Sequence, residues 1–191
     1  MGGLKVALAP TLLGNVTNVP TGEGVNNIGY SAGCSNPTLT DNYFVAGTAL
    51  TLNCTGTISL TGNTFVGSIS GFSQAGHPVN TFSSGRPSGS RVFVRPSQHD
   101  AARAHIAVVN WDNLDSVAVD VSGVLSMGDP YELVDAQDLF AAPLRSGVYS
   151  GGMLAVPMNG TSVTTPVGNV PVTVRHTSKE FGAFVLRRSC P

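Results

Sequence analysis

The stretch LTDNYFVAG, residues 39–47, is followed by LTGNTFVGS, residues 60–68. Both copies follow the pattern Leu-Thr-x-Asn-x-Phe-Val and continue with a small residue. Repeats with periods of roughly 20 residues or more are typical of stacked architectures, in which each unit buries its apolar face only against its neighbours. The recurrence therefore predicts that the chain returns to the same corner of a coil, one level further along.

Residues at matching positions of the two copies are expected to lie in adjacent layers. Asn42 and Asn63 match, so their side-chain amides are expected to form a hydrogen-bonded ladder along the stack. The alternating segments 50–52 and 57–60 are expected to be half-buried strands. The predicted core layers are Leu39, Phe44, Leu60 and Phe65.

The cysteines lack the CxxC spacing of zinc or redox sites. Cys34 and Cys54 lie about one repeat apart, so stacking would allow a disulfide between them, and two buried thiols are the alternative. Cys190 is left over as a free or intermolecular thiol.

Composition favours an all-β chain, because only 11% of the residues are charged while Gly, Thr, Ser, Asn and Val are plentiful. The net charge of −1 argues against a large electrostatic contribution to binding of nucleic acid or anionic membranes. No apolar run approaches the roughly 18 residues of a membrane span. The sequence therefore predicts neither nucleic-acid binding nor a membrane span.

Charge density divides the chain in two. Up to Gly85 the acidic and basic residues are only Lys5, Glu23 and Asp41, and all the others lie from Arg86 onward. We therefore predict two domains, residues 1–85 and 86–191, joined by the Ser-, Gly- and Pro-rich stretch 81–91.

The second half contains short β-rich runs separated by turn residues, a spacing typical of an antiparallel sandwich. Alternation along one run places Val117, Val119 and Val121 toward the core. The predicted strands are 91–95, 104–110, 116–124, 131–135, 153–158, 170–175 and 181–187.

The two halves resemble different secreted bacterial proteins. DNYFVAG and GNTFVGS resemble the last coils of right-handed parallel β-helix proteins, a likeness that spans residues 26–71. NWDNLDSVAVDVSGVL and FGAFVLRR resemble parts of the β-sandwich modules that follow the catalytic portions of glycoside hydrolases and other carbohydrate-active proteins, over residues 91–188. The resemblance implies terminal rungs of a β-helix followed by an antiparallel β-sandwich, an accessory role, and a secreted or cell-surface location.

Candidate catalytic residues concentrate after the connector. A polysaccharide lyase or glycoside hydrolase would have its site at the junction of the two halves, where its residues would be Arg91, Arg95, His99, Asp100 and Asp112. A metal bound by His99, Asp100 and His105 would need a further ligand such as His77 or His176, and nothing in the spacing brings these residues together. The motif GFSQAG, residues 71–76, misses the nucleophile pattern G-x-S-x-G, so Ser73 is expected to be a turn hydroxyl.

A run of regularly spaced acids offers a possible metal site. Asp129, Glu132, Asp135 and Asp138 are three residues apart. Clustered carboxylates suit calcium, but the spacing lacks the loop pattern of an EF-hand. A solvated turn and strand edge is the alternative, so no cofactor is predicted and structural calcium stays an option.

Sugar-binding platforms use exposed aromatic rings, and the candidates here are Trp111, Tyr131, Tyr149 and Phe140. Trp111 follows a predicted strand at a turn, where it is either an exposed ligand contact or a core residue.

The leading hypothesis is a non-catalytic module of a secreted bacterial protein, with a carbohydrate-associated or cell-surface structural role. Its partners would be a polysaccharide or upstream β-helix coils, and the unpaired edge at the end of a coil would also allow end-to-end self-association. The alternative is the polysaccharide-degrading enzyme with its site at the junction.

Overall fold

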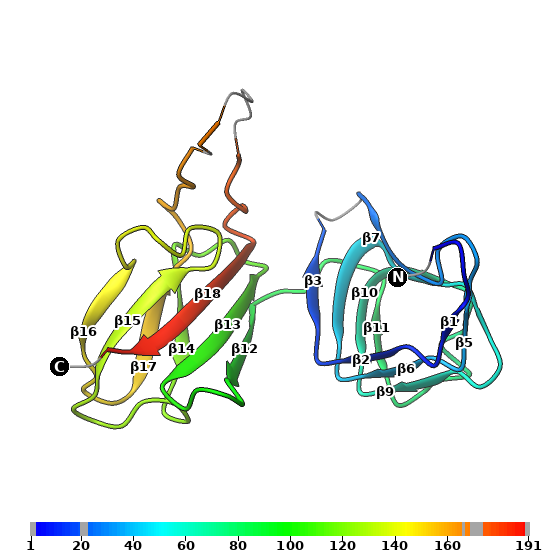
Figure 1. Cartoon of the computed structure of the whole chain (residues 1–191), viewed down its shortest axis with the longest axis horizontal. Helices are drawn as coiled ribbons and strands as arrows, with labels where there is room; N and C mark the ends of the chain where they lie inside the picture. The colour runs from blue at the N-terminus through cyan, green and yellow to red at the C-terminus, as the bar shows by residue number, and fades with distance from the viewer. Residues whose placement is uncertain (1–2, 20–22, 166, 169–173, 190–191) are drawn as a thin grey trace. The chain divides into compact units, whose positions relative to one another are not determined.

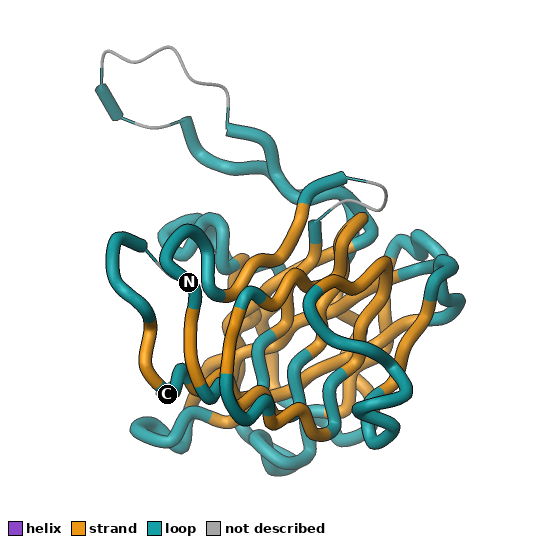
Figure 2. The backbone as a smooth tube through the Cα atoms, turned by 90° about the vertical axis from the view of Figure 1, so that its right-hand side faces the viewer, coloured by secondary structure: helices purple, strands orange, loops and turns teal. Residues whose placement is uncertain are grey.

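The computed structural model describes residues 3–19, 23–165, 167–168 and 174–189. Its regular structure is strand throughout, with parallel and antiparallel sheets and no helix among these residues (Figures 1 and 2). The predicted all-β class is confirmed. The chain divides into two compact units, Met1–Pro87 and Ser88–Pro191.

The first unit consists of three parallel sheets that the chain visits repeatedly in the same order (Figure 1). One sheet contains β1 (Ala7–Leu8), β5 (Cys34–Ser35) and β8 (Cys54–Thr55), and the next contains β2 (Thr11–Leu13), β6 (Thr38–Thr40) and β9 (Ser59–Thr61). The third contains β3 (Val16–Asn18), β4 (Val25–Ile28), β7 (Tyr43–Leu52), β10 (Thr64–Ser70) and β11 (Thr81–Ser83). We call each passage through the three sheets a circuit: β1 to β4 form the first, β5 to β7 the second and β8 to β10 the third.

The repeated motif sets the register between circuits. Leu39 pairs with Leu60 across β6 and β9, and Phe44 pairs with Phe65 across β7 and β10. All of these side chains are buried, which confirms the predicted core layers. The Phe44 and Phe65 rings stack with centroids 5.7 Å apart, and Phe82 of β11 stacks on Phe65 at 5.2 Å. A column of aromatic rings therefore runs through the interior of the first unit.

A second column consists of asparagine side chains, one at the same corner of each level. The Nδ2 group of Asn15 donates to Oδ1 of Asn42 at 2.9 Å, Asn42 donates to Asn63 at 2.8 Å, and Asn63 donates to Asn80 at 2.9 Å. Each acceptor oxygen also receives the backbone N–H of the preceding asparagine. The predicted pairing of Asn42 with Asn63 is confirmed, and the ladder extends one residue further at each end.

The residue before each of the first three asparagines turns the corner with a left-handed backbone. Its φ is 63° at Gly14, 52° at Asp41 and 66° at Gly62. Glycine adopts this conformation without steric strain, and Asp and Asn tolerate it better than other residues do. The variable position of the motif therefore accepts only this small set of residues without strain.

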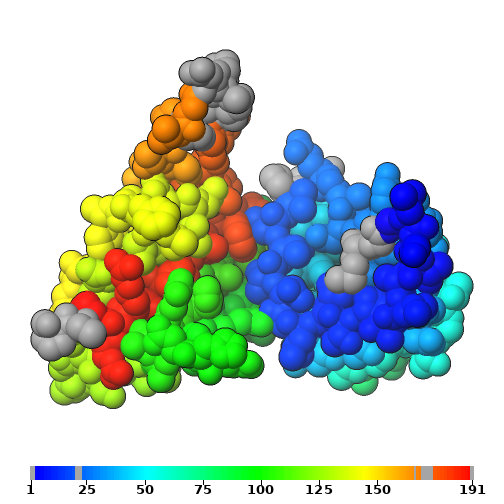
Figure 3. All heavy atoms as spheres, in the orientation of Figure 1, coloured from blue at the N-terminus to red at the C-terminus, as the bar shows by residue number. Residues whose placement is uncertain are grey.

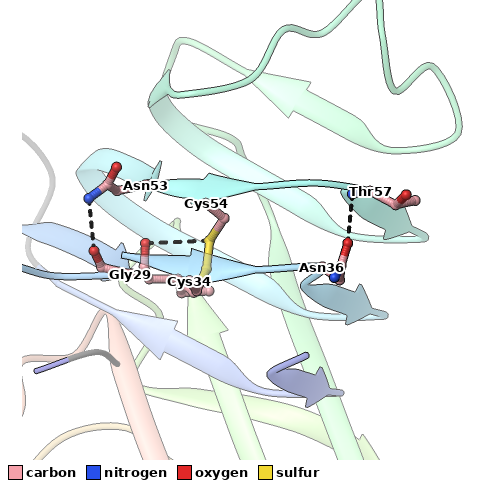
Figure 4. The surroundings of a disulfide bond; sticks show 7 residues. Gly29, Cys34, Asn36, Asn53, Cys54 and Thr57 are labelled. Carbon is pink, nitrogen blue, oxygen red and sulfur yellow. Dashed lines mark hydrogen bonds between the residues drawn. A yellow bond between two sulfur atoms is a disulfide. The ribbon is translucent and has the colours of Figure 1, made fainter. Parts of the chain in front are cut away.

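The disulfide between Cys34 and Cys54 links β5 to β8, whose Cα atoms are 4.3 Å apart at these residues (Figure 4). Of the two alternatives open from the sequence, the structure has the disulfide. Asn36 accepts the Thr57 N–H at 2.9 Å and so connects the same two circuits (Figure 4). Asn53, in the link just before β8, donates to the carbonyl of Gly29, in the link before β5, at 3.0 Å (Figure 4). Covalent and hydrogen bonds thus fasten the second circuit to the third on this side.

The second unit contains a five-stranded antiparallel sheet and a two-stranded antiparallel sheet. The larger sheet has the order β12 (Ser90–Pro96), β13 (Arg103–Asn110), β18 (Phe181–Arg188), β15 (Pro130–Asp135) and β16 (Arg145–Val148). The smaller sheet pairs β14 (Ser116–Asp120) with β17 (Met153–Pro157), and in Figure 1 it lies behind the larger one. Val117, Val119 and Val121 are buried in the core that both sheets share, as predicted from their alternation.

Three details differ from the sequence prediction. β16 was not predicted, because Arg145, Ser146 and Gly147 lack β-branched or aromatic side chains. The predicted connector 81–91 contains β11 and the start of β12, because Phe82 joins the aromatic column. The predicted strand 170–175 lies mostly outside the described residues, and its last two residues are not in a strand.

Candidate functional site

The candidate site lies on the outer face of the five-stranded sheet of the second unit. Alternate residues of each strand point away from the shared core, and antiparallel pairing aligns them in rows. In Figure 3 this face shows β18 in red beside β13 in green. The outward residues include Arg91, Phe93, Arg95, Arg103, His105, Glu132, Val134, Val185 and Arg187.

Arginine dominates this face. Arg91 and Arg95 of β12 both lie against the Phe93 ring, with their Cζ atoms 5.7 and 5.9 Å from its centroid. Arg103 of β13 is the direct cross-strand partner of Arg187 of β18. The strand pairing therefore places four arginines from three strands on one face. These arginines are scattered in the sequence, so the sequence alone did not predict a basic patch.

A pocket of about 360 Å³ opens at the end of this face, and we call it the arginine groove. It is lined by buried Val134 and Val185 and by Leu139 and Phe140 of the segment after β15. The Phe140 side chain is fully exposed. The remaining lining residues are Asp100, Ala102, Arg103, Arg187 and Arg188.

The groove's arginines differ in how they are neutralised. The Arg187 Nε donates to Glu132 Oε2 at 2.7 Å, and Arg188 Nη1 donates to Asp129 Oδ2 at 3.4 Å. The Arg103 side chain makes no hydrogen bond or ion pair with any described residue. Two like charges placed directly opposite on neighbouring strands repel each other. Arg103 is thus a cation beside another cation, at the lining of a pocket.

The predicted catalytic residues are separated by the length of one strand. His99 and Asp100 lie in the β12–β13 turn, and Asp100 accepts the Ala102 N–H at 3.0 Å. Asp112 follows the opposite end of β13 and accepts the Gly89 N–H at 2.9 Å. At about 3.4 Å per residue, the eight residues of β13 put these groups more than 20 Å apart. Asp100 lines the arginine groove, and Arg95 lies on the same face of the sheet as the groove. Asp112 is not among the residues that line the groove.

The four acids proposed as calcium ligands each have a different partner. Glu132 binds Arg187, and Asp129 binds Arg188 and the Ser126 N–H. Asp138 accepts both the Thr164 hydroxyl and the Thr164 N–H, and these bonds, the hydroxyl first, hold the pKa of its carboxyl below the ordinary value. Within the described ranges no group of three or more acids, histidines or cysteines is arranged to hold a metal.

Asp135 is buried and its carboxylate lies 2.5 Å from Nε2 of His176. The other ring nitrogen, Nδ1, lies 3.1 Å from the Thr161 hydroxyl and 2.9 Å from the Thr177 carbonyl oxygen. Gln137 accepts the N–H and the hydroxyl of Thr177. The contacts of Asp135, Gln137 and Asp138 fasten both arms of the long β17–β18 connection to the end of β15.

The predicted sugar-binding aromatics are mostly packed inside. Trp111 is 3% exposed and Tyr149 is 6% exposed, so neither presents a ring face to a ligand. Tyr131 is half-buried against the core and shares a pocket of about 240 Å³ with Tyr149 and Arg145. The Tyr149 hydroxyl donates to the Gly152 carbonyl at 2.6 Å. Phe140 is the candidate whose ring is open to solvent.

Comparison of the chain with protein families, curated proteins and solved structures finds no match. In the part of the chain that the structure describes, there is also no helix with the length and apolar character that a membrane crossing requires. The site must therefore be interpreted from its own geometry.

Proposed function

We propose that this chain is a non-catalytic, carbohydrate-associated module of a secreted or cell-surface bacterial protein. In this proposal the three circuits are the terminal rungs of a right-handed parallel β-helix, and the antiparallel sheets form an accessory β-sandwich. The polysaccharide binds at the arginine groove.

The observation that carries the proposal is the exposed Phe140 ring at a pocket whose lining is both apolar and charged. Sugar rings have apolar C–H faces that pack on aromatic rings, while their hydroxyls need charged or polar hydrogen-bond partners. The groove offers both kinds of contact, because its lining includes Phe140 and Leu139 as well as Asp100, Arg103 and Arg187. A fully exposed phenylalanine gains nothing from burial in the folded chain itself, so its contact area is available to a ligand.

A panel of soluble and insoluble polysaccharides, both neutral and acidic, tests the proposal. The wild-type protein should be retained on at least one of them, and Phe140→Ala should weaken retention at least tenfold. Tyr30→Ala is the matched control, because Tyr30 is a largely exposed aromatic of the first unit and lies outside the groove. Failure of the wild-type protein to bind any polysaccharide would reject the carbohydrate role.

The alternative function is polysaccharide degradation. The Asp135–His176 pair supports it, because a carboxylate can orient a histidine for proton transfer. Release of reducing ends or of unsaturated products should be measured on the same panel. Activity that disappears in His176→Ala, while the variant keeps the wild-type circular dichroism spectrum, would replace the binding module with an enzyme.

A further inference from the structure

We propose that the arginine groove selects acidic polysaccharides, and that Arg103 binds the carboxylate of a uronic acid residue while Phe140 packs on its sugar ring. This inference rests on the proposed carbohydrate function and deepens it by naming the ligand class.

The charge distribution of the groove points to an anionic ligand. Arg103 and Arg187 are cross-strand partners, and Glu132 neutralises Arg187 only. A carboxylate supplied from outside would contact the Arg103 guanidinium and relieve its repulsion by Arg187. Guanidinium groups bind carboxylates through two parallel N–H···O bonds, which fix the orientation of the ligand as well as its position.

The other lining residues favour a sugar acid over a simple anion or a nucleic acid. Val134, Val185 and Leu139 give the pocket apolar walls, and Phe140 adds a free ring face. Asp100 has a carboxylate in the same lining, which suits a ligand with hydroxyl donors. A DNA phosphate backbone offers no hydroxyl donor that could pair with the Asp100 carboxylate. The volume of about 360 Å³ suits one or two sugar rings.

Isothermal titration with oligomers of galacturonic acid tests the selectivity, with the fully methyl-esterified oligomer as the uncharged counterpart of the same backbone. We expect the acid to bind at least tenfold more tightly than the ester, and its affinity to fall when salt rises from about 50 to 500 mM. Arg103→Gln should weaken acid binding at least tenfold and abolish the preference for the acid. Phe140→Ala should weaken both ligands.

Arg145→Gln is the matched control, because it removes the same charge from an exposed residue at the other pocket, beside Tyr131 and Tyr149. Loss of binding in Arg145→Gln but not in Arg103→Gln would move the site to that pocket and overturn the inference. Equal affinity for acid and ester would overturn the acidic selectivity while leaving the carbohydrate function intact. Tighter binding of a single-stranded oligonucleotide than of the galacturonate oligomers would overturn both.

Discussion

The two units of this chain build β-structure by different means. In the first unit, residues at matching positions of successive circuits stack on one another, as the Asn15–Asn42–Asn63–Asn80 row and the Phe44–Phe65–Phe82 column show. In the second unit, β18 pairs with strands from distant parts of the chain, so that Arg187 lies beside both Arg103 and Glu132.

The difference decides where charged side chains are located. A stacked unit repeats its side chains at one corner, so a charged residue repeated there would repel its neighbour on the next level, whereas uncharged amides donate and accept along the row. An antiparallel sheet places unlike sequence segments side by side and so tolerates dense charge on its outer face. The first unit is accordingly poor in charge, and the candidate ligand site lies in the second.

The largest expected effect comes from the centre of the aromatic column. Phe65 is 0% exposed and its ring contacts Phe44, Phe72 and Phe82. Phe65→Ala should lower the free energy of unfolding of the first unit by about 3–5 kcal/mol, because it leaves a large cavity. Urea titration followed by far-ultraviolet circular dichroism measures the loss, and Phe140→Ala, at an exposed position, should change stability by less than about 0.5 kcal/mol.

The same titration followed by tryptophan fluorescence separates the two units, because the single tryptophan, Trp111, belongs to the second. If the units are independent, Phe65→Ala should leave the Trp111 transition unchanged. An equal shift of both signals would show that the two units unfold together as one cooperative structure.

Removing the disulfide should have the next largest effect. Cys34 and Cys54 are 20 residues apart in sequence, and a bond that closes a loop of this length stabilises the folded state by about 3 kcal/mol. Cys34→Ser with Cys54→Ser, in a Cys190→Ser background, should lower the free energy of unfolding of the first unit by about this amount. Thermal unfolding with and without reductant measures this loss of stability. A wild-type melting temperature that does not change when reductant is added would contradict the presence of the disulfide.

The interior of the asparagine ladder should matter more than its end. Asn63→Ala removes the acceptor of the Asn42 amide and the donor to the Leu39 carbonyl, and unpaired buried groups cost about 2–3 kcal/mol in all. Asn15→Ala, at an exposed position, should cost less than about 1 kcal/mol. Urea titration of both variants measures the two costs, and equal losses would show that the ladder does not act as a buried network.

The smallest expected effect is a pH dependence at Asp138 in the second unit. Bonds from Thr164 lower the pKa of Asp138 in the folded state, so this contact stabilises the fold above the ordinary carboxyl pKa and is lost as pH falls through the lowered value. The Thr164 amide resonance should therefore shift below about pH 4, and Asp138→Ala should remove that titration. The Asn63 side-chain resonances should stay constant, because amides do not ionise over this range. A Thr164 resonance that does not change with pH would contradict the hydrogen bonds between Asp138 and Thr164.

The sequence predicted the contacts that repeat at a constant interval and missed those that do not. Asn42 and Asn63 are 21 residues apart, so one period revealed them, whereas Asn15 precedes Asn42 by 27 residues and Asn80 follows Asn63 by 17. The triplets Asn42-Tyr43-Phe44, Asn63-Thr64-Phe65 and Asn80-Thr81-Phe82 were a visible signal for the last level. Circuit length varies because loops outside the strands change length without changing the corner.

In the second unit, strand alternation was readable but strand neighbours were not. The runs R-V-F-V-R (91–95) and R-A-H (103–105) already place their charges on one face of each strand. Alternation along a strand does not determine which strands are adjacent or in which register, so the gathering of Arg95, Arg103 and Arg187 could not be predicted. Trp111 was ambiguous for a similar reason, since a residue just after a strand can point to either side.

The direction of the asparagine row has a consequence for how this unit can change in length. The Nδ2 groups of Asn15, Asn42 and Asn63 each donate to the oxygen of the next asparagine, and those of Asn42, Asn63 and Asn80 also donate to a leucine carbonyl of the preceding circuit. The row ends at Asn80, whose N–H and Nδ2 group donate to the His77 carbonyl. An inserted circuit with an asparagine at its corner would supply the same N–H donors and the same acceptor oxygen as the levels beside it. The asparagines on either side of the insertion would therefore keep equivalent hydrogen-bond partners. Whole levels can therefore be gained or lost by duplication or deletion without leaving an unpaired amide at the join.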